Sequence, residues 1–154
     1  MKEQTRREML ATSVRVASLL AGAGLLPKFA HAAWPQAAFE TKSLADAVKA
    51  LGGAAPAASG DVTITGPDIA ENGAVVPVGA STTAAGAKRL LLLVEKNPNA
   101  LAAVFELTDA VEPNISTRVK MAQTSNVYAV AMLADGRTLY AVKEIKVTLG
   151  GCGG

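Results

Sequence analysis

The sequence predicts a mainly β protein: an immunoglobulin-like antiparallel β-sandwich with one N-terminal helix and a flexible, glycine-rich C-terminal arm. Seven short segments alternate in polarity or run apolar at regular spacing, and glycine, proline and asparagine separate them. About 122 residues remain once a leader is removed, which suits one domain with a single core. These observations favour a sandwich over a helical bundle or a parallel α/β sheet.

Residues 1–32 have the features of an export leader. A twin arginine lies at 6–7, an apolar run covers 16–26, and alanines at both ends of 30–32 match an A-x-A cleavage site. The run is too short to cross a bilayer as a helix, so we expect no membrane anchor after cleavage. The paired arginines favour the twin-arginine route, which predicts a periplasmic protein that begins near Ala33. The alternative is an amphipathic or buried N-terminal helix that belongs to the fold.

The composition of the mature chain excludes several kinds of function. Of the 15 basic and 13 acidic residues, five and two precede residue 33, which leaves 10 and 11 and a nearly neutral chain. No basic patch indicates a nucleic acid or a lipid surface as the partner. His31, the only histidine, leaves with the leader. With no histidine and one cysteine, the mature chain lacks the usual nucleophile–base pairs and the usual ligands of zinc, copper and haem, so we expect neither an enzyme nor a metal or cofactor site.

One helix is predicted over 43–51, at the start of the domain. Ser43 and Asp46 resemble a capping box, and apolar residues follow Leu44 at i+3, i+4 and i+7. Gly52 and Gly53 then end the helix.

The remaining segments are expected to be strands. The predicted strands are 61–65, 74–78, 89–95, 102–107, 116–121, 127–133 and 138–149. Pro77 marks a strand end or a sheet edge, the leucine-rich 89–95 is expected at the centre of a sheet, and Asp135-Gly136 predicts a two-residue hairpin. The segment 127–133 is apolar on both faces. Either a helix covers its outer face or a partner subunit does, and the sequence leaves both explanations open.

The C-terminus contains the candidate functional residue. Cys152, the only cysteine, lies between Gly150, Gly151, Gly153 and Gly154. Glycine runs favour a mobile tail, and a thiol on such an arm can enter another protein's active site and return. Three residues beyond position 149 reach about 10 Å when extended. A single cysteine in an exported protein excludes an internal disulfide, which leaves a working thiol or an intermolecular disulfide.

The charges around this thiol predict low intrinsic reactivity. The nearest basic residue in the sequence is Lys146, and the terminal carboxylate of Gly154 lies two residues from Cys152. A negative neighbour disfavours the thiolate, which is the reactive form. We therefore expect the accepting enzyme to activate the thiol.

These features together resemble the SoxY family, the sulfur-carrier subunits of the bacterial Sox system for thiosulfate oxidation. The Gly-Gly-Cys152-Gly-Gly tail and the twin-arginine leader fit the family. Further likeness lies in Asn72-Gly73 with the following 76–78, in Asn97-Pro98 with Phe105, and in 115–121. One departure is Ala100, where the resemblance leads us to expect a second proline.

The resemblance implies a division into a leader (1–32), a carrier domain (33–149) and a carrier arm (150–154). It also implies a leaderless SoxZ-like partner subunit that is exported together with this chain. A Sox cytochrome would load thiosulfate onto Cys152, a hydrolase would release sulfate, and in complete pathways a sulfane dehydrogenase would oxidise the remaining sulfur. The carrier itself would catalyse none of these steps.

Two other functions stay open from the residues alone. One is a non-catalytic exported sandwich that dimerises through a Cys152 disulfide. The other is a carrier that holds sulfur as a thiocarboxylate on Gly154, although this would need ATP-dependent activation and would leave Cys152 without a role.

Overall fold

The structure, a computed structural model, describes residues 6–22 and 35–149. The chain divides into two units, Met1–Trp34 and Pro35–Gly154, and each is described by itself. In the first unit, helix α1 spans Arg6–Gly22 and begins at the paired arginines. Within the described parts of the chain, no helix has the length and apolar character needed to span a membrane. The predicted cleavage site at 30–32 lies outside the described residues.

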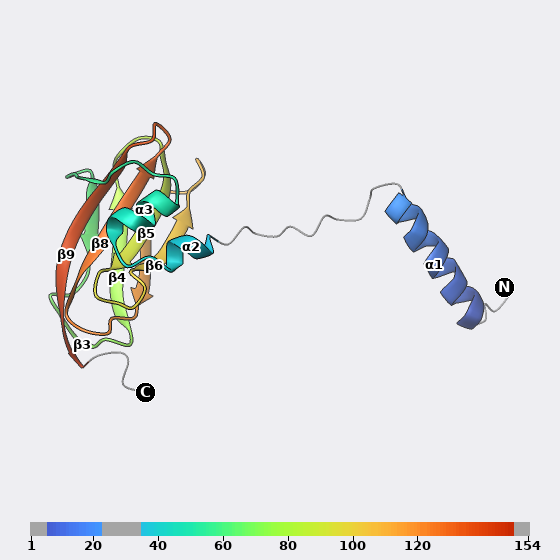
Figure 1. The fold of residues 1–154 in the computed structure, drawn as a ribbon, viewed down its shortest axis with the longest axis horizontal. Coiled ribbons are helices and arrows are strands. Elements are labelled where there is room, and N and C mark those ends of the chain that lie inside the picture. Colours follow the sequence, from blue (N-terminus) through green and yellow to red (C-terminus); the bar gives the residue numbers. More distant parts are fainter. Residues whose placement is uncertain (1–5, 23–34, 150–154) are drawn as a thin grey trace. The chain divides into compact units, whose positions relative to one another are not determined.

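The second unit is a sandwich of two β-sheets, with helices on one outer face (Figure 1). The larger sheet has the strand order β1, β9, β8, β5, β6, with β3 also paired to β9, and the smaller sheet has the order β2, β4, β7. The strands are β1 Ala57–Ala58, β2 Val62–Thr65, β3 Ile69–Asn72, β4 Val76–Thr82, β5 Ala87–Val94, β6 Leu101–Glu106, β7 Asn114–Val119, β8 Ser125–Leu133 and β9 Thr138–Leu149. The predicted fold class is confirmed, and each of the seven predicted strands corresponds to an observed one.

Two short strands, β1 and β3, were not expected. Both pair with the same edge of β9 and run parallel to it, so the sandwich is not purely antiparallel. The sequence pattern missed them because β1 has two residues and β3 has only four, with Ala70 as its one buried side chain. Strand signals depend on longer runs of alternating polarity.

The leucines of β5 explain why this strand is apolar on both faces. Leu90 and Leu92 point into the core between the sheets, together with Ile145 of β9 and valines of β4. Leu91 and Leu93 belong to a second cluster on the outer face of the same sheet. Because successive side chains of a strand point to opposite faces, a central strand between two apolar layers must be apolar throughout. β5 does lie between β8 and β6, as expected.

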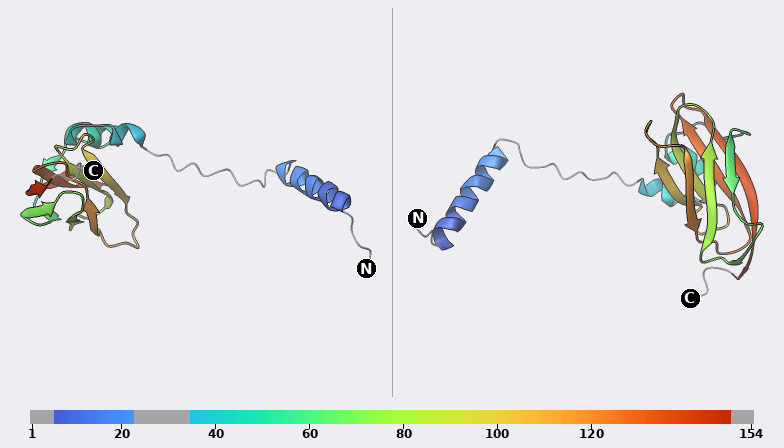
Figure 2. Two further views of the ribbon diagram at one scale, coloured as in Figure 1. Left: turned by 90° about the horizontal axis from the view of Figure 1, so that it is seen from below. Right: turned by 180° about the vertical axis from the view of Figure 1, so that it is seen from behind.

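Helices cover this outer face. α2 spans Gln36–Phe39 and α3 spans Leu44–Ala50. The helices pack along one side of the sandwich, as Figure 2 shows. They contribute Ala38, Ala47 and Val48 to a cluster that also contains Val130 and Met132 of β8. At Val130 and Met132, the outer face of the apolar segment 127–133 is therefore covered by helices of the same chain, which was the first of the two explanations. α2 itself, with only four residues, was not expected.

Helix α3 begins and ends as its sequence predicts. The Ser43 hydroxyl accepts a hydrogen bond of 3.1 Å from the backbone N–H of Asp46 and donates one of 2.6 Å to its carboxylate. At the other end, the Gly53 N–H donates to the carbonyl of Val48 and the Gly52 N–H to that of Lys49. This is the Schellman arrangement, and it needs the positive φ of 79° that Gly52 adopts. The two glycines thus fix where the helix stops.

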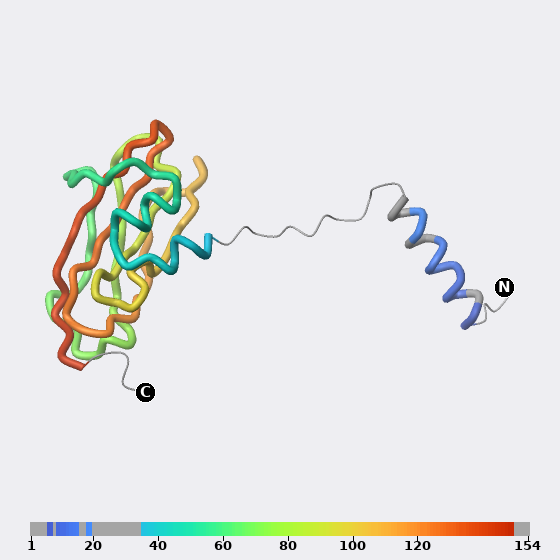
Figure 3. The backbone as a smooth tube through the Cα atoms, in the orientation of Figure 1, coloured from blue at the N-terminus to red at the C-terminus, as the bar shows by residue number. Residues whose placement is uncertain are grey.

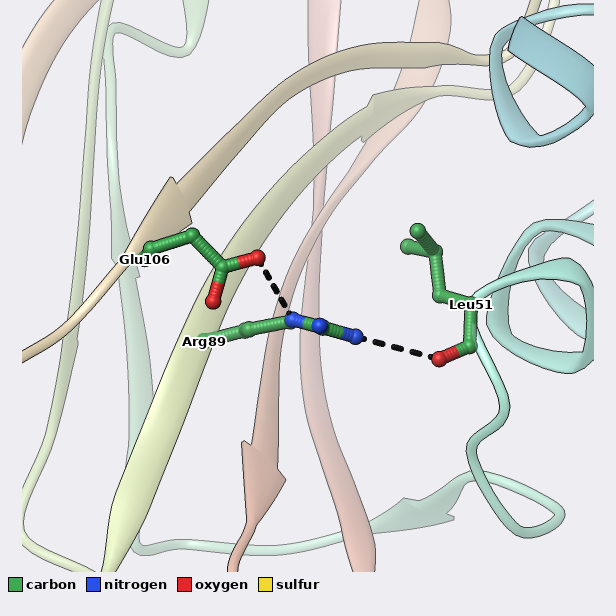
Figure 4. A network of polar contacts seen from close by, with 3 residues as sticks. All are labelled: Leu51, Arg89 and Glu106. Carbon is green, nitrogen blue, oxygen red and sulfur yellow. Dashed lines mark hydrogen bonds and ion pairs between the residues drawn. The ribbon is translucent and has the colours of Figure 1, made fainter. Parts of the chain in front are cut away.

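Arg89 of β5 joins this helix to the sheet (Figure 4). Its Nε lies 2.7 Å from Glu106 Oε1 on β6, and its Nη1 donates to the Leu51 carbonyl at 3.1 Å. A guanidinium at a helix C-terminus binds carbonyl groups that lack helical partners and complements the helix dipole. The contact therefore holds the end of α3 on the sheet.

The β8–β9 hairpin differs from the prediction of a two-residue turn. Met132 pairs with Thr138, and the Leu133 N–H donates to the Arg137 carbonyl, so the loop holds three residues, 134–136. A two-residue type I′ turn would need positive φ at both Asp135 and Gly136, but only Gly136 has it, at 90°. The Arg137 N–H donates to the Asp135 carboxylate and stabilises this longer loop. Figure 3 traces the chain through this hairpin into β9.

Pro77 lies near the beginning of β4, and the expectation of a strand end is confirmed. β4 is the middle strand of the smaller sheet, but β2 pairs only with its residues 79–82. Pro77 therefore has a strand neighbour on one side only, Arg118 of β7. A residue without an N–H is tolerated where one of the two ladders is missing.

Candidate carrier site

The candidate site begins where β9 ends. β9 pairs with β8 along its first eight residues and ends at Leu149, the last residue that the structure describes. The predicted site residue Cys152 and its four flanking glycines lie outside the described residues. What the structure positions is the point of origin of that tail. We call residues 146–149 of β9 the arm root.

Strand β3 fixes one side of the arm root. The two strands pair in parallel, with Asn72 opposite Leu149. The Gly73 N–H donates to the Leu149 carbonyl at 2.8 Å, and the Thr148 hydroxyl donates to the Glu71 carbonyl at 2.9 Å. The backbone is therefore hydrogen-bonded up to the last residue before Gly150, which gives the tail a fixed starting point.

The segment 120–124 supports the arm root from the β8 side. The Val147 N–H donates to the Thr124 hydroxyl at 3.0 Å. The Met121 N–H donates to the Gly73 carbonyl at 2.7 Å, and the Met121 side chain is fully buried in the core. Gly73 thus links the end of β9 to residue 121 through its two backbone groups.

Asn97 connects a third loop to this support. Its Nδ2 donates to the Lys120 carbonyl at 2.7 Å, and its Oδ1 accepts from the Ala122 N–H at 3.0 Å. A side-chain amide can donate and accept at once, so one residue ties the segment from both sides. From the sequence, Asn97 was noted only because Asn97-Pro98 resembles the family. Its role in supporting the arm root was not predicted.

Ala100, the one departure from the family pattern, has a structural role here. Its N–H donates to the Thr41 carbonyl at 2.9 Å, and its carbonyl accepts from the Val94 N–H at 2.8 Å. Its side chain is buried against the helix layer. A proline at this position could not donate the first of these bonds, so alanine suits the contact with the segment between α2 and α3.

Charges of both signs lie near the arm root. Lys146, Glu71 and Asp68 are exposed, and the Lys146 N–H donates to the Asp68 carbonyl. Lys143 Nζ lies 2.9 Å from Asp68 Oδ1. The hydrogen bond and the charge of this ammonium lower the pKa of Asp68 below its ordinary value, and the charge of Lys146 adds to the effect. The predicted lack of thiol activation concerns residues beyond 149 and stays a prediction.

The described part of the domain has a hollow but no cluster of metal ligands. Among them, no group of three or more His, Cys, Asp or Glu side chains could hold a metal ion. A shallow hollow of about 310 Å³ on the smaller sheet is lined by Thr65, Ser116 and neighbouring glycine, proline and valine residues, none of which has a titratable side chain. The candidate site is therefore the arm root, which is held by hydrogen bonds and precedes a short tail that contains the only cysteine.

The fold and the arm root define a β-sandwich whose last strand continues directly into a cysteine-bearing tail. The family model for the sulfur oxidation protein SoxY matches residues 47–152, a range that includes Cys152. The chain belongs to the SoxY family.

Comparison with solved structures agrees with this assignment. The sulfur carrier protein SoxY from Chlorobium limicola f thiosulfatophilum is similar, with 33% identity, a TM-score of 0.59, and coverage of 66% of this chain and 92% of that one. A superoxide reductase (neelaredoxin) from Ignicoccus hospitalis shares 20% identity with a TM-score of 0.50, over 56% of this chain and 79% of that one, and this likeness extends to the fold alone. A comparison with curated proteins gave no match.

Proposed function

We propose that the chain is a periplasmic sulfur carrier that holds thiosulfate-derived sulfur covalently on Cys152 and presents it to Sox enzymes. The observation that supports this best is the family match, which extends to residue 152 and so includes the only thiol in the chain. The fixed arm root supports it too, because a rigid origin limits the space that a five-residue tail must search before it enters an enzyme.

The chemistry on the arm requires partner enzymes. Loading forms a bond between Cys152 Sγ and the sulfane sulfur of thiosulfate, and it releases the thiol proton and two electrons, which a haem cytochrome would accept. A hydrolase would then add water to the terminal sulfone and release sulfate, which leaves a persulfide on Cys152. Because the chain belongs to a family of sulfur carriers, we propose that it is the substrate of each step and not its catalyst.

We further propose a SoxZ-like partner subunit and export by the twin-arginine route. That route transports folded proteins, so a leaderless partner could cross the membrane bound to this chain. The paired arginines at the start of α1 and the alanines at positions 30 and 32 support such a leader.

The intact mass of the protein from the periplasm of thiosulfate-grown cells tests these points together. We expect a chain that begins near Ala33, elutes with a second polypeptide, and bears a sulfur adduct that a thiol reductant removes. The Cys152→Ser variant should lack the adduct and keep the partner, because residue 152 lies beyond the hydrogen-bonded end of β9.

Other outcomes would point elsewhere. A homogeneous reducible dimer without any adduct would support the disulfide-linked sandwich instead of a carrier. An adduct that persists in Cys152→Ser would place the sulfur on another group, such as the Gly154 carboxylate.

A further inference from the structure

Exposed apolar side chains lie on the segments that form and hold the arm root. Among the large hydrophobic residues exposed in 35–149, three belong to β3, the turn after it, and the end of β9: Ile69 is 58% exposed, Val75 54% and Leu149 71%. The others are Val142, which lies seven residues before Leu149 on β9, and Val111, in the loop between β6 and β7. Scattered exposed apolar residues need no explanation, but a group around one functional point does.

Hydrogen bonds place this group on a rigid support. The Asn72 side chain accepts from the Ala74 N–H at 2.8 Å, which shapes the turn that presents Val75. Gly73, which follows Asn72 in that turn, donates its N–H to the Leu149 carbonyl. Val75 and Leu149 thus occupy adjoining, hydrogen-bonded segments at the end of the domain where β3 and β9 finish (Figure 1). We call Val75 and Leu149 the root collar. Ile69 does not belong to it, because Ile69 lies opposite Lys146, three positions before Leu149, and so points to the opposite face of the sheet.

The length of the tail decides what must approach the root collar. Cys152 follows Leu149 by three residues, so its Cα lies at most about 10 Å from that of Leu149. Any enzyme that reacts with the thiol in a recessed site must bring the mouth of that site close to the place where the tail leaves the domain. The collar residues lie at that place and are exposed before docking.

We propose that the root collar is the docking surface for the enzymes that load and process Cys152, and that it contacts an apolar rim around the entrance of their active sites. The proposal rests on the carrier function proposed above. Apolar contact is non-directional, so one collar can serve several enzymes in turn. Its small size suits short-lived complexes, because a carrier must leave each enzyme after one step.

Steady-state loading by the purified haem cytochrome of the host, with thiosulfate and the complete mature carrier complex, tests the proposal. Val75→Ser and Leu149→Ser should each raise the KM for the carrier about fivefold to tenfold and leave kcat within about twofold, because the apolar contact forms on docking and the thiol is intact. The rate of alkylation of Cys152 by iodoacetamide should not change, since that reagent needs no docking.

Val111→Ser is the matched control. Val111 is 51% exposed, and its loop lies near the far end of β4, where the Thr82 N–H bonds to the Pro113 carbonyl. This control should load with the KM of the wild type. Equal KM values for all variants, or an equal rise in Val111→Ser, would overturn the docking proposal while the carrier function stands. A wild-type carrier that the cytochrome does not load would overturn both.

Discussion

In the proposed function, Cys152 and its glycines would have two different tasks. The thiol holds the cargo in the function proposed here, whereas the glycines would determine whether the thiol reaches an enzyme. Residues up to Leu149 are held by β3 and by 120–124, and the glycine-rich sequence begins at the next residue. Reactivity and delivery can therefore be separated by mutation.

The double variant Gly151→Val, Gly153→Val tests delivery. Valine is stiff at χ1, bars the positive φ values open to glycine, and widens the tail where it enters a pocket. We expect thiosulfate-dependent turnover to fall about tenfold or more, because small misplacements at a reacting centre are costly. Alkylation of Cys152 by a small reagent should proceed at nearly the wild-type rate. Normal turnover with every Sox enzyme would show that the glycines have no role in delivery.

At the residue scale, the sequence alone indicates the candidate functional residue but not the residues that support the arm root. A lone cysteine between four glycines is visible without a structure. The sequence does not reveal the roles of Gly73, Asn97 and Ala100, because each forms hydrogen bonds to residues far away in the chain. Only the fold brings those partners together.

At the scale of elements, the layer of helices explains the apolar strands. α2 and α3 cover Leu91 and Leu93 of β5 and Val130 and Met132 of β8. The alternative of a partner subunit on the same face makes a different prediction for the mature chain alone. If helices already bury Leu91, its truncation must destabilise the chain even without any partner.

Leu91→Ala in the mature chain should therefore lower the free energy of unfolding by about 2–5 kcal/mol, as expected for a leucine removed from a packed core. The control Val111→Ala, at an exposed position, should change it by less than about 0.5 kcal/mol. Urea unfolding followed by circular dichroism measures both. A loss below about 1 kcal/mol for Leu91→Ala would contradict the close packing of helices on this face.

The elements that the sequence predicts are those with local signals. Alternating polarity predicted β7 and β9, and a run of leucines predicted β5. A capping serine and two terminal glycines predicted α3. The parallel pairing of β1 and β3 with β9 depends on contacts between distant segments, so short strands without alternation stay hidden. The hairpin length was wrong because it depends on the φ of one residue, Asp135, which composition does not determine.

At the scale of the whole molecule, the domain has no side chain whose ordinary pKa lies near neutral pH. Residues 35–149 contain no histidine and no cysteine. Two carboxyl groups have lowered pKa values: Asp68, because of the hydrogen bond and charge of Lys143, and Asp135, because of hydrogen bonds from the backbone and side chain of Arg137. Both groups are exposed, so each effect on stability is small and screened by salt.

These shifts predict how the stability of the mature domain depends on pH. A carboxyl group whose pKa is lower in the folded state contributes stability above its unfolded pKa, and this contribution is lost as the pH falls through its folded pKa. The free energy of unfolding should therefore be nearly constant between about pH 5 and pH 8 and should fall below about pH 4. Urea titrations at a series of pH values measure this profile.

Asp68→Asn isolates the contribution of one pair in that profile. Above about pH 5 the variant should be slightly less stable than the wild type, and the difference should shrink as the pH falls below about 4, because protonation of Asp68 removes the charge that Lys143 stabilises. Glu112→Gln is the control, since Glu112 forms no ion pair among the described residues and should give no such convergence. A difference between Asp68→Asn and the wild type that stays constant from pH 2 to pH 8 would show that the ammonium of Lys143 does not stabilise the ionised form of Asp68. The lysine would then contribute through its hydrogen bond of 2.6 Å to the Gly66 carbonyl, which holds the loop before β3 in place whatever the charge of Asp68.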